Sequence, residues 1–400
     1  MAQRLRTDWI LFFTMLALVC FGLVMVYSTS MVPHDTQHAA QVQSDAQAPA
    51  QTPPPTPSES GSWSLFAKQF AWAIVSLLAL AYVTKQDYRR WNHPMWAFSC
   101  LGLVVLLLVV VYFADGRSHR WLKLGGLSLQ PSEFAKPALA LFLAFFLTRR
   151  LGAINHKNTL APIILSTCAM AVFVALGDLG TAVVLVMTTV MVVWVAGLDL
   201  KYLGLTLVIG MVAGSVFIAA KPYRLIRVIN FVDAQHHALD WIDPGHHILN
   251  YAQQTNGALD TGYQQKQARI AVGSGGVIGV GLMQSRQKMR FLPKPYTDMI
   301  YAVVGEETGF FGATVLLAGF AIVLWRGLRI YRGAQDDFGR YLALTATICI
   351  VVQALINISV VLDLGPTKGI PLPFISYGGS SLMSTLLLMG MVMSVSERAG

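Results

Sequence analysis

The sequence predicts an all-α, polytopic integral membrane protein that crosses the bilayer about ten times. Its 400 residues are 55% hydrophobic and only 12% charged, whereas soluble domains carry about 25% charged residues. A chain of this composition lacks the polar side chains that a surface in water requires. Repeated apolar runs of about 20 residues match the thickness of the hydrocarbon core of a bilayer. Short basic loops between some of these runs predict a fixed orientation in the membrane.

Each predicted span corresponds to one apolar run that is long enough to cross as a helix. We expect the spans at residues 9–28, 64–83, 95–114, 132–149, 160–176, 181–197, 202–220, 299–325, 341–362 and 382–396. The first run is too long for the apolar part of a signal peptide and lacks a small-residue cleavage site after it, so we interpret it as a retained span. The four cysteines lie in separate runs, which argues against a disulfide framework or a metal site.

Lysine and arginine residues in short loops set the predicted orientation. They follow the second, fourth and eighth runs, at Lys85, Arg89, Arg90, Arg149, Arg150, Lys157, Arg326, Arg329 and Arg332. Because short basic loops tend to stay in the cytoplasm, we expect both termini there. Residues 1–400 then form a single membrane domain.

Three segments are predicted on the opposite, extracytoplasmic side. Residues 31–62 are polar and rich in proline, so we expect a disordered loop. Residues 221–298 form a large loop between the seventh and eighth spans, with nine Lys or Arg against five Asp. These cations either keep the loop soluble or form an anion site at the outer surface. Residues 365–381 are too rich in proline and glycine for a continuous helix, which favours the wall of a cavity.

Several polar residues lie in or beside the apolar runs. Glu133 and Lys136 are three residues apart on one helical face and can form an ion pair, since an isolated charge in lipid is costly. The pair is either a structural staple or takes a direct part in substrate handling. Asp178 lies in a tight turn, where aspartate is an ordinary residue. Arg120, beside Trp121, fits an interfacial anchor with a phosphate-seeking arginine.

The large loop contains three segments of chemical interest. Arg224 and Arg227 share a helical face near the headgroups, where they could bind phosphate oxygens. The glycines of residues 271–281 lack the βαβ context of a dinucleotide site, so we expect a close backbone approach or a re-entrant turn. Asp298 ends the loop where the eighth span begins, and helix capping alone would explain it there. Histidine pairs at 236–237 and 246–247 show no metal-ligand pattern, and we interpret them as loop residues.

Together these motifs resemble the SEDS family, which contains FtsW and RodA. The matching segments occur in family order along nearly the whole chain. They are Arg120-Trp121, QPSEFAK at 130–136, DLGTA at 178–182, PYR-x-x-R at 222–227, GYQ at 262–264, QK-x-x-FLP-x-x-x-TD at 287–298, GEE-x-G at 305–309 and GIPLPFISYGGSS at 369–381. PTKG at 366–369 and the first span lean towards FtsW. Residues 234–260 look like an insertion relative to the family.

The resemblance implies a peptidoglycan glycosyltransferase that joins lipid II units into glycan strands at the outer face of the bacterial cytoplasmic membrane. Asp298 takes the position of the family's catalytic carboxylate, although Tyr296 stands where the family usually has histidine. In this interpretation Asp298 is a general base and the anomeric carbon is inverted. The residues expected to bind substrate or pyrophosphate are Tyr223, Arg224, Arg227, Gln264, Lys288, Lys368 and Ser376. Polar residues with a structural or functional part are Glu133, Lys136, Arg120, Asp178 and Glu307.

The implied partners are lipid II, membrane lipid and a class B penicillin-binding transpeptidase, with no nucleic acid. No metal site is assigned and no cofactor is required by the sequence, although a divalent cation at the pyrophosphate stays open. The main alternative is a transporter or flippase of lipid-linked precursors, because broken segments and an intramembrane ion pair are typical of transporters. Against it, the polar motifs gather on one side of the membrane and no inverted repeat is evident.

Overall fold

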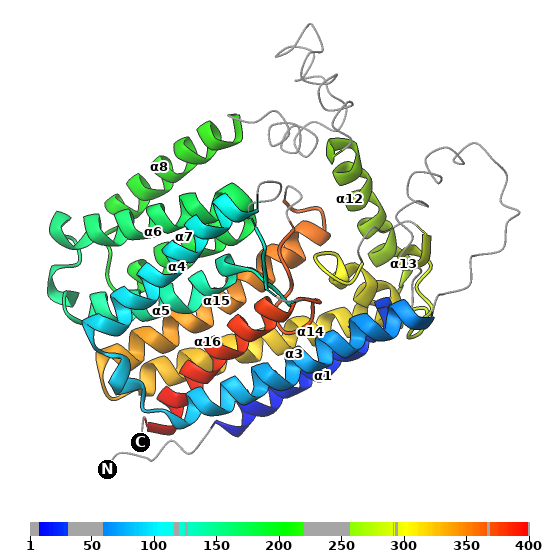
Figure 1. Ribbon diagram of the computed structural model, residues 1–400, viewed down its shortest axis with the longest axis horizontal. Helices are drawn as coiled ribbons and strands as arrows, with labels where there is room; N and C mark the ends of the chain where they lie inside the picture. The colour runs from blue at the N-terminus through cyan, green and yellow to red at the C-terminus, as the bar shows by residue number, and fades with distance from the viewer. Residues whose placement is uncertain are drawn as a thin grey trace, which may run out of the picture.

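The computed structural model describes residues 8–30, 59–115, 120–124, 127–219, 257–290, 292, 295–365 and 369–398. Over these residues the chain is a bundle of long helices (Figure 1). The α-helices are α1 (Trp9–Ser30), α3 (Glu59–Lys85), α4 (Pro94–Ala114), α5 (Pro131–Thr148), α6 (Lys157–Gly177), α7 (Leu179–Val195), α8 (Leu200–Ala219), α12 (Gly257–Ser274), α13 (Gln287–Arg290), α14 (Ile300–Gly333), α15 (Asp337–Val361) and α16 (Gly379–Arg398). Short 3-10 helices η1 (Tyr88–Trp91) and η2 (Leu151–Ala153) follow α3 and α5.

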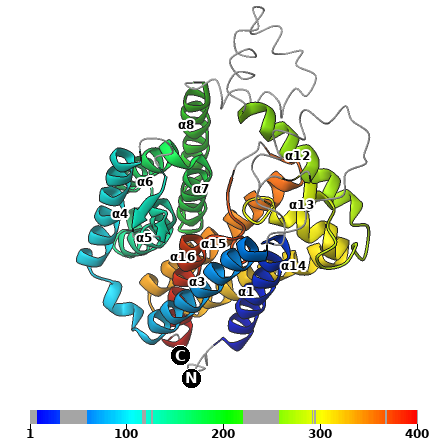
Figure 2. The same cartoon turned by 45° about the vertical axis from the view of Figure 1, so that its right-hand side comes forward.

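Each predicted apolar run coincides with one long helix, and the chain is a multi-pass helical membrane protein. Seven helices within the described residues are long and apolar enough to cross a bilayer, namely α1, α3, α4, α6, α14, α15 and α16, while α7 is an apolar helix of 17 residues. The total of ten spans stays a prediction. The first turn of α1 and the last turn of α16 lie at the same end of the bundle (Figures 1 and 2), as expected if both termini share one side of the membrane.

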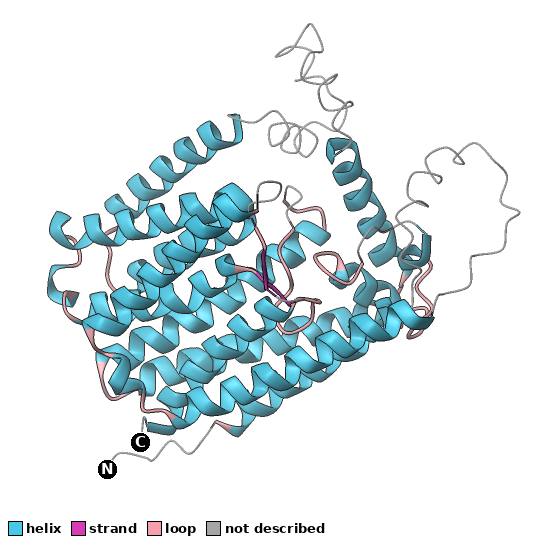
Figure 3. Cartoon of the chain, in the orientation of Figure 1, coloured by secondary structure: helices cyan, strands magenta, loops and turns pink. Residues whose placement is uncertain are grey.

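The structure differs from the predicted elements in four places, of which three concern added or extended elements. A two-stranded antiparallel hairpin, β1 (Leu122–Leu124) and β2 (Leu127–Leu129), precedes α5 and was not predicted (Figure 3). Helix α3 already begins at Glu59, inside the loop predicted for residues 31–62. The large outer loop contains the 18-residue helix α12. Residues 31–58 and 220–256, which carry most of the Pro-rich loop and of the predicted insertion, lie outside the described residues.

The predicted basic loop after the eighth span is wrong, because Arg326, Arg329 and Arg332 lie inside α14. This helix continues to Gly333. Arg326 is nearly buried and binds Asp8 through two nitrogens, with Nε at 2.7 Å and Nη2 at 2.6 Å from Oδ2. A buried carboxylate thus neutralises the arginine and lets the helix continue past the apolar run.

Helices α15 and α16 form the centre of the bundle. In the most apolar 18-residue stretch of each of these helices, 83% is buried inside the protein, compared with 17% in the corresponding stretch of α4. Helix α15 contacts α5, α7, α14 and α16, whereas α4 exposes large apolar side chains such as Phe113 and Leu106. A helix that is apolar all round and buried is a core helix, and one that is apolar and exposed faces lipid. The loop between α15 and α16 therefore emerges from the centre of the bundle.

Candidate active site around Asp298

Asp298 lies in the turn of residues 295–299, immediately before α14. Its side chain is half-buried, and Oδ1 accepts a hydrogen bond of 2.9 Å from Thr297 Oγ1. Gly369 lies against the other carboxylate oxygen, because a Cβ atom on this glycine would be 3.2 Å from Oδ2. Any larger residue at position 369 would crowd the carboxylate.

Helix capping does not account for Asp298. Met299 occupies the N-cap position of α14, and its side chain makes no capping hydrogen bond. The Thr297 hydroxyl donates to Asp298 Oδ1. The N-cap of α14 is therefore Met299, and Asp298 has a role other than capping this helix.

The loop between α15 and α16 packs directly against the Asp298 turn. The Ser376 hydroxyl donates to Thr297 O (2.5 Å) and accepts from Leu372 N (2.7 Å). Tyr377 N donates to Tyr296 O (2.8 Å), and the two tyrosine rings meet edge to face with their centroids 5.6 Å apart. Because both bonds of the buried Ser376 hydroxyl are internal, its placement differs from that expected of a substrate ligand.

Tyr296 stands where the related family usually has histidine, and its chemistry differs accordingly. Burial raises the pKa of the Tyr296 phenol, and the neighbouring Tyr377 adds to this shift. The phenol is therefore neutral throughout the physiological pH range, unlike an imidazole. Position 296 contributes a packing surface and a neutral hydroxyl in this chain.

Two buried amides of α15 bind the same region. Asn357 Nδ2 donates to Asp298 O (2.8 Å) and to Ile370 O (2.7 Å). Gln353 Nε2 donates to Pro371 O (2.8 Å). Sequence analysis missed both residues, although an amide side chain inside an apolar run is costly without a partner and is a signal in itself.

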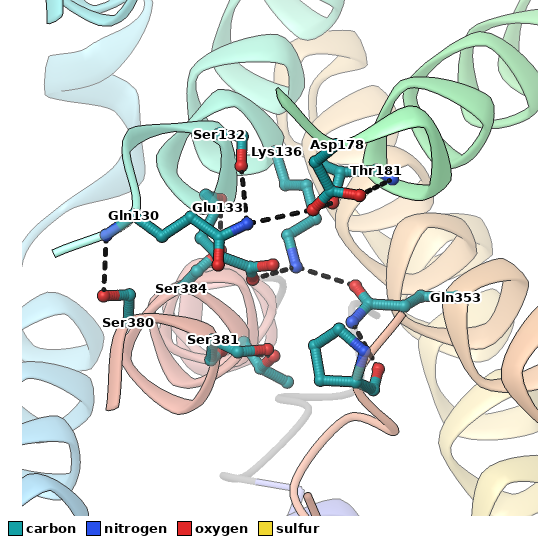
Figure 4. Close-up of polar contacts among 12 residues, drawn as sticks. Gln130, Ser132, Glu133, Lys136, Asp178, Thr181, Gln353, Ser380, Ser381 and Ser384 are labelled. Atoms are coloured by element: carbon teal, nitrogen blue, oxygen red, sulfur yellow. Dashed lines mark hydrogen bonds and ion pairs between the residues drawn. The ribbon is translucent and has the colours of Figure 1, made fainter. Parts of the chain in front are cut away.

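Glu133 and Lys136 form the predicted ion pair inside the bundle, with Nζ and Oε2 2.6 Å apart (Figure 4). Both side chains are about 1% exposed. Lys136 also donates to Gln353 Oε1 (2.7 Å), and Ser384 Oγ of α16 donates to Glu133 O (2.7 Å). Glu133 Oε1 has no hydrogen-bond partner in the part of the chain that the structure describes. The pair joins α5 to α15, as a structural staple would.

Asp178 has more contacts than a turn residue needs. Its Oδ1 accepts from Thr181 N (3.2 Å), which caps α7. Its Oδ2 accepts from Gln130 Nε2 (2.9 Å) and from Arg120 Nη2 (3.2 Å), residues 48 and 58 positions earlier, so three motifs meet at one carboxylate (Figure 4 shows Gln130 and Asp178). The interpretation of Asp178 as an ordinary turn residue was therefore incomplete. Arg120 is occupied by this ion pair.

Lys288 is buried and belongs to a closed polar cluster at the C-terminal end of α1 and the N-terminal part of α14. Its ammonium group donates to Glu307 Oε1 (2.5 Å), Ser28 Oγ (2.7 Å) and Ser28 O (3.1 Å), which uses all three of its hydrogens. The Ser28 hydroxyl in turn donates to Glu307. Burial lowers the pKa of Lys288, and Glu307 opposes this shift. This environment differs from that expected of a pyrophosphate ligand.

The glycine-rich segment after α12 makes the predicted close backbone approach. It packs on a break in α14 at Gly309, whose φ is +66°. A Cβ atom on Gly279, itself at φ +88°, would lie 2.2 Å from Glu307 O. Phe310 N donates to Gly276 O (2.9 Å), and Val280 N donates to Glu306 O (3.0 Å). The prediction of close approach is confirmed.

The remaining predicted ligands are only partly placed. Gln264 lies half-buried on α12, next to Gln265, whose Nε2 donates to Gly365 O (3.0 Å). The other four predicted ligands lie outside the described residues, and so do the four loop histidines. These ligands are Tyr223, Arg224, Arg227 and Lys368. Among the described residues, no three His, Cys, Asp or Glu side chains come close enough to hold a metal ion.

Sequence comparison relates nearly the whole chain to known proteins. A profile of the family of FtsW, RodA and SpoVE, described as cell cycle protein, matches residues 55–399. Stage V sporulation protein E of Bacillus subtilis is 33% identical over 400 residues, which cover 99% of this chain and 98% of that protein. A probable peptidoglycan glycosyltransferase FtsW of Geobacter metallireducens is 34% identical over 398 residues, which cover 98% and 95% of the two chains.

Solved structures share the same architecture. A chain from a peptidoglycan synthase complex that coordinates polymerization and crosslinking has a TM-score of 0.71 and 26% identity, covering 98% of both chains. The rod shape determining protein RodA of Thermus thermophilus has a TM-score of 0.63 and 24% identity, covering 98% of this chain and 96% of that one. The second likeness supports the fold alone.

Proposed function

This chain belongs to the FtsW, RodA and SpoVE family, and from that premise we propose that it is a peptidoglycan glycosyltransferase that polymerises lipid II. The observation that carries the proposal is the placement of Asp298. Its half-buried carboxylate lies one residue before the N-cap of α14, its carbonyl accepts from Asn357 of α15, and the carbonyl of the preceding Thr297 accepts from Ser376 of the 369–377 loop. A carboxylate held in this way suits a general base.

In the proposed reaction, Asp298 accepts the proton of the 4-hydroxyl group of the acceptor's GlcNAc. A positioned base typically contributes about 10²–10⁴-fold to such a step, because a sugar hydroxyl is a weak nucleophile at neutral pH. The hydroxyl oxygen bonds to the anomeric carbon of the donor's lipid-linked MurNAc as the bond from that carbon to phosphate breaks. Attack from the face opposite to the leaving group inverts the anomeric centre.

The leaving undecaprenyl pyrophosphate needs positive charge nearby. Arg224, Arg227 and Lys368 are our candidates for this task, since cations that meet developing charge replace the acid used by glycoside hydrolases. Tyr223 and Gln264 are further candidates for substrate contacts. Lys288 and Ser376 are reassigned to holding the site together, because their polar atoms are used internally. A divalent cation at the pyrophosphate stays open.

The proposed setting is the outer face of the bacterial cytoplasmic membrane, in association with a class B penicillin-binding transpeptidase. Under this proposal residues 221–298 carry the active site, residues 365–381 form its wall, and lipid tails lie between the spans. The alternative of a lipid flippase requires access to both leaflets. Polymer formation from lipid II by purified protein in detergent, where no second compartment exists, would support the enzyme over the flippase.

The decisive variant is Asp298→Asn, which keeps the size of the side chain but removes the base. We expect polymerisation to fall by at least about 10²-fold, measured by gel analysis of glycan strands with and without the transpeptidase. Asp363→Asn is the matched control, because Asp363 is another outer carboxylate and its φ of 62° also suits asparagine. Full polymerisation by the Asp298 variant would refute the assigned base.

A further inference from the structure

We propose that Asn357 and Gln353 are positioning residues that hold Asp298 and the 369–377 loop in the geometry needed for catalysis. The two amides are four residues apart on α15, so they share one helical face. Each is about 2% exposed. The inference rests on the proposed function, because it assigns the amides a task that they perform through Asp298.

Asn357 joins two backbone segments that are far apart in sequence. Its amide nitrogen carries two hydrogens, and these bind Asp298 O on one segment and Ile370 O on the other, at 2.8 and 2.7 Å. The bond to Asp298 reaches the backbone and not the carboxylate. Asn357 therefore fixes where the carboxylate is without occupying it, and leaves its oxygens to other contacts.

Gln353 holds the next carbonyl of the same loop. Its Nε2 donates to Pro371 O (2.8 Å), while its Oε1 accepts from Lys136 (2.7 Å), which is paired with Glu133. The orientation of the amide is thereby set by a buried charge, and hydrogen bonds to charged groups are stronger than neutral ones. A continuous series of contacts runs from the intramembrane ion pair through α15 to the Asp298 turn.

The 369–377 loop needs such external support. Pro371 and Pro373 lack backbone N–H groups, and the loop forms no helix or strand. Its internal backbone bonds, from Ile375 N and Ser376 N to Leu372 O, are local and do not tie it to the bundle. One backbone bond, from Tyr377 N to Tyr296 O (2.8 Å), ties it to the Asp298 turn. The side chains of Asn357, Gln353 and Gln69 tie it to the bundle, and Gln69 Nε2 donates to Ser376 O at 3.4 Å.

An amide is a costly residue for plain packing, because a polar group in an apolar span is destabilising unless it is bonded, and Asn357 Oδ1 has no partner among the described residues. Leucine or methionine would fill the same space. The geometry is demanding for a chemical reason, since misplacing a reacting group by about 1 Å can cost about 10²-fold in rate. The two amides thus serve accuracy at the site more than cohesion of the bundle.

The test compares Asn357→Leu and Gln353→Met with Thr345→Val in the full-length protein. Thr345 is an equally buried polar residue of α15, and among the residues that the structure describes its hydroxyl bonds only its own helix, at Tyr341 O. Steady-state polymerisation of lipid II gives kcat and KM, and hydrogen exchange is followed in peptides that cover 295–299 and 369–377. We expect kcat to fall about 10- to 100-fold for Asn357→Leu and less for Gln353→Met, with KM changed less than about threefold.

We also expect faster exchange in those two peptides alone, and a Thr345→Val protein that matches the wild type in every measurement. Unchanged exchange in the loop would overturn the proposal. Wild-type kcat in the Asn357 variant would overturn it as well, and so would faster exchange throughout α15 and α16, which indicates general loosening. A wrong base assignment gives a different result. In that case Asp298→Asn would remain active, while the Asn357 variant would still show a lower kcat and faster hydrogen exchange in the 369–377 loop.

Discussion

The structure contains two buried lysine–glutamate pairs, and they differ in what lies beyond them. The pairs Glu133–Lys136 and Lys288–Glu307 have similar distances, 2.6 and 2.5 Å, and all four side chains are at most about 1% exposed. The Lys288 ammonium group is saturated by Ser28 and Glu307, so its cluster is closed. Lys136 instead extends through Gln353 to the Asp298 region.

A lysine that is close in sequence to a candidate catalytic residue therefore need not be close to it in chemical role. Lys288 lies in the same motif as Asp298, yet its contacts join α13 to α1 and α14. Lys136 is 162 positions before Asp298, yet it is connected to the loop that packs against that aspartate. The Lys288–Glu307 pair joins α13 to α1 and α14, and the Glu133–Lys136 pair is connected through Gln353 to the 369–377 loop.

The largest effect is expected when one member of either pair is removed. Lys288→Met and Lys136→Met each leave a buried carboxylate without its cation, which typically costs about 3–5 kcal/mol. We expect strongly reduced yield and a lower Tm in detergent, measured by fluorescence-detected size exclusion and thermal unfolding. If one variant kept the wild-type Tm, the two pairs would not be equivalent in stability.

A smaller loss of stability is expected from Gly279→Ala, in the glycine-rich segment that packs on α14. The new methyl group would meet Glu307 O at 2.2 Å on a backbone with φ +88°, so strain and overpacking together should cost about 2–4 kcal/mol. Gly276→Ala is the matched control, because it also has positive φ (+56°) but meets no atom within 4 Å. Equal Tm values for the two variants would contradict the close approach.

Neutralising both members of each pair separates the two roles. We expect Lys288→Met/Glu307→Gln to keep kcat near the wild-type value, since replacing a whole buried pair is often neutral for stability. Lys136→Met/Glu133→Gln should lose about tenfold in kcat, equivalent to about 1.4 kcal/mol, because Gln353 loses its charged partner. Polymerisation rates normalised to folded protein test this prediction, and equal rates would remove the distinction between the pairs.

The smallest effect is expected at an exposed ion pair of the same outer region. Arg269 and Asp363 are 3.2 Å apart, and the Arg269 side chain is 68% exposed. Arg269→Gln should change stability by about 0.2–1 kcal/mol and leave kcat unaltered, because solvent screens such pairs. A thermal unfolding series in low and high salt provides the measurement, and a loss as large as that of the buried pairs would show that screening is not the deciding factor.

Much of the fold could be predicted from the sequence because the bilayer imposes length and polarity on each helix. The apolar runs locate all the long helices except α12 to within a few residues, apart from the continuation of α14 to Gly333. That extension escaped prediction because Arg326 was counted as a loop cation, and its partner Asp8 is 318 positions away. The hairpin at Leu122–Leu129 escaped because two strands of three residues leave little periodic signal.

The site was predictable only where one residue carries the signal alone. Glu133 and Lys136 are of this kind, since they are charges in an apolar run, whereas the position of Asp298 alone indicates a helix cap and its catalytic role is implied only by the family resemblance. The contacts of Asn357, Gln353 and Ser376 depend on how the 369–377 loop folds back on the 295–299 turn, and no local pattern encodes that pairing. Residues that become partners only through the tertiary fold can be identified only from the structure.

The unequal burial of the helices has a consequence for the membrane in which the protein works. Bilayers differ in thickness, and exposed spans adapt to this hydrophobic mismatch by tilting. Lipid contacts mainly the outer helices such as α4, while α15 and α16 are sheltered at the centre. We therefore expect a change in acyl-chain length to be absorbed at the periphery, and α15, whose Asn357 binds Asp298 O, to keep its alignment as lipid composition varies.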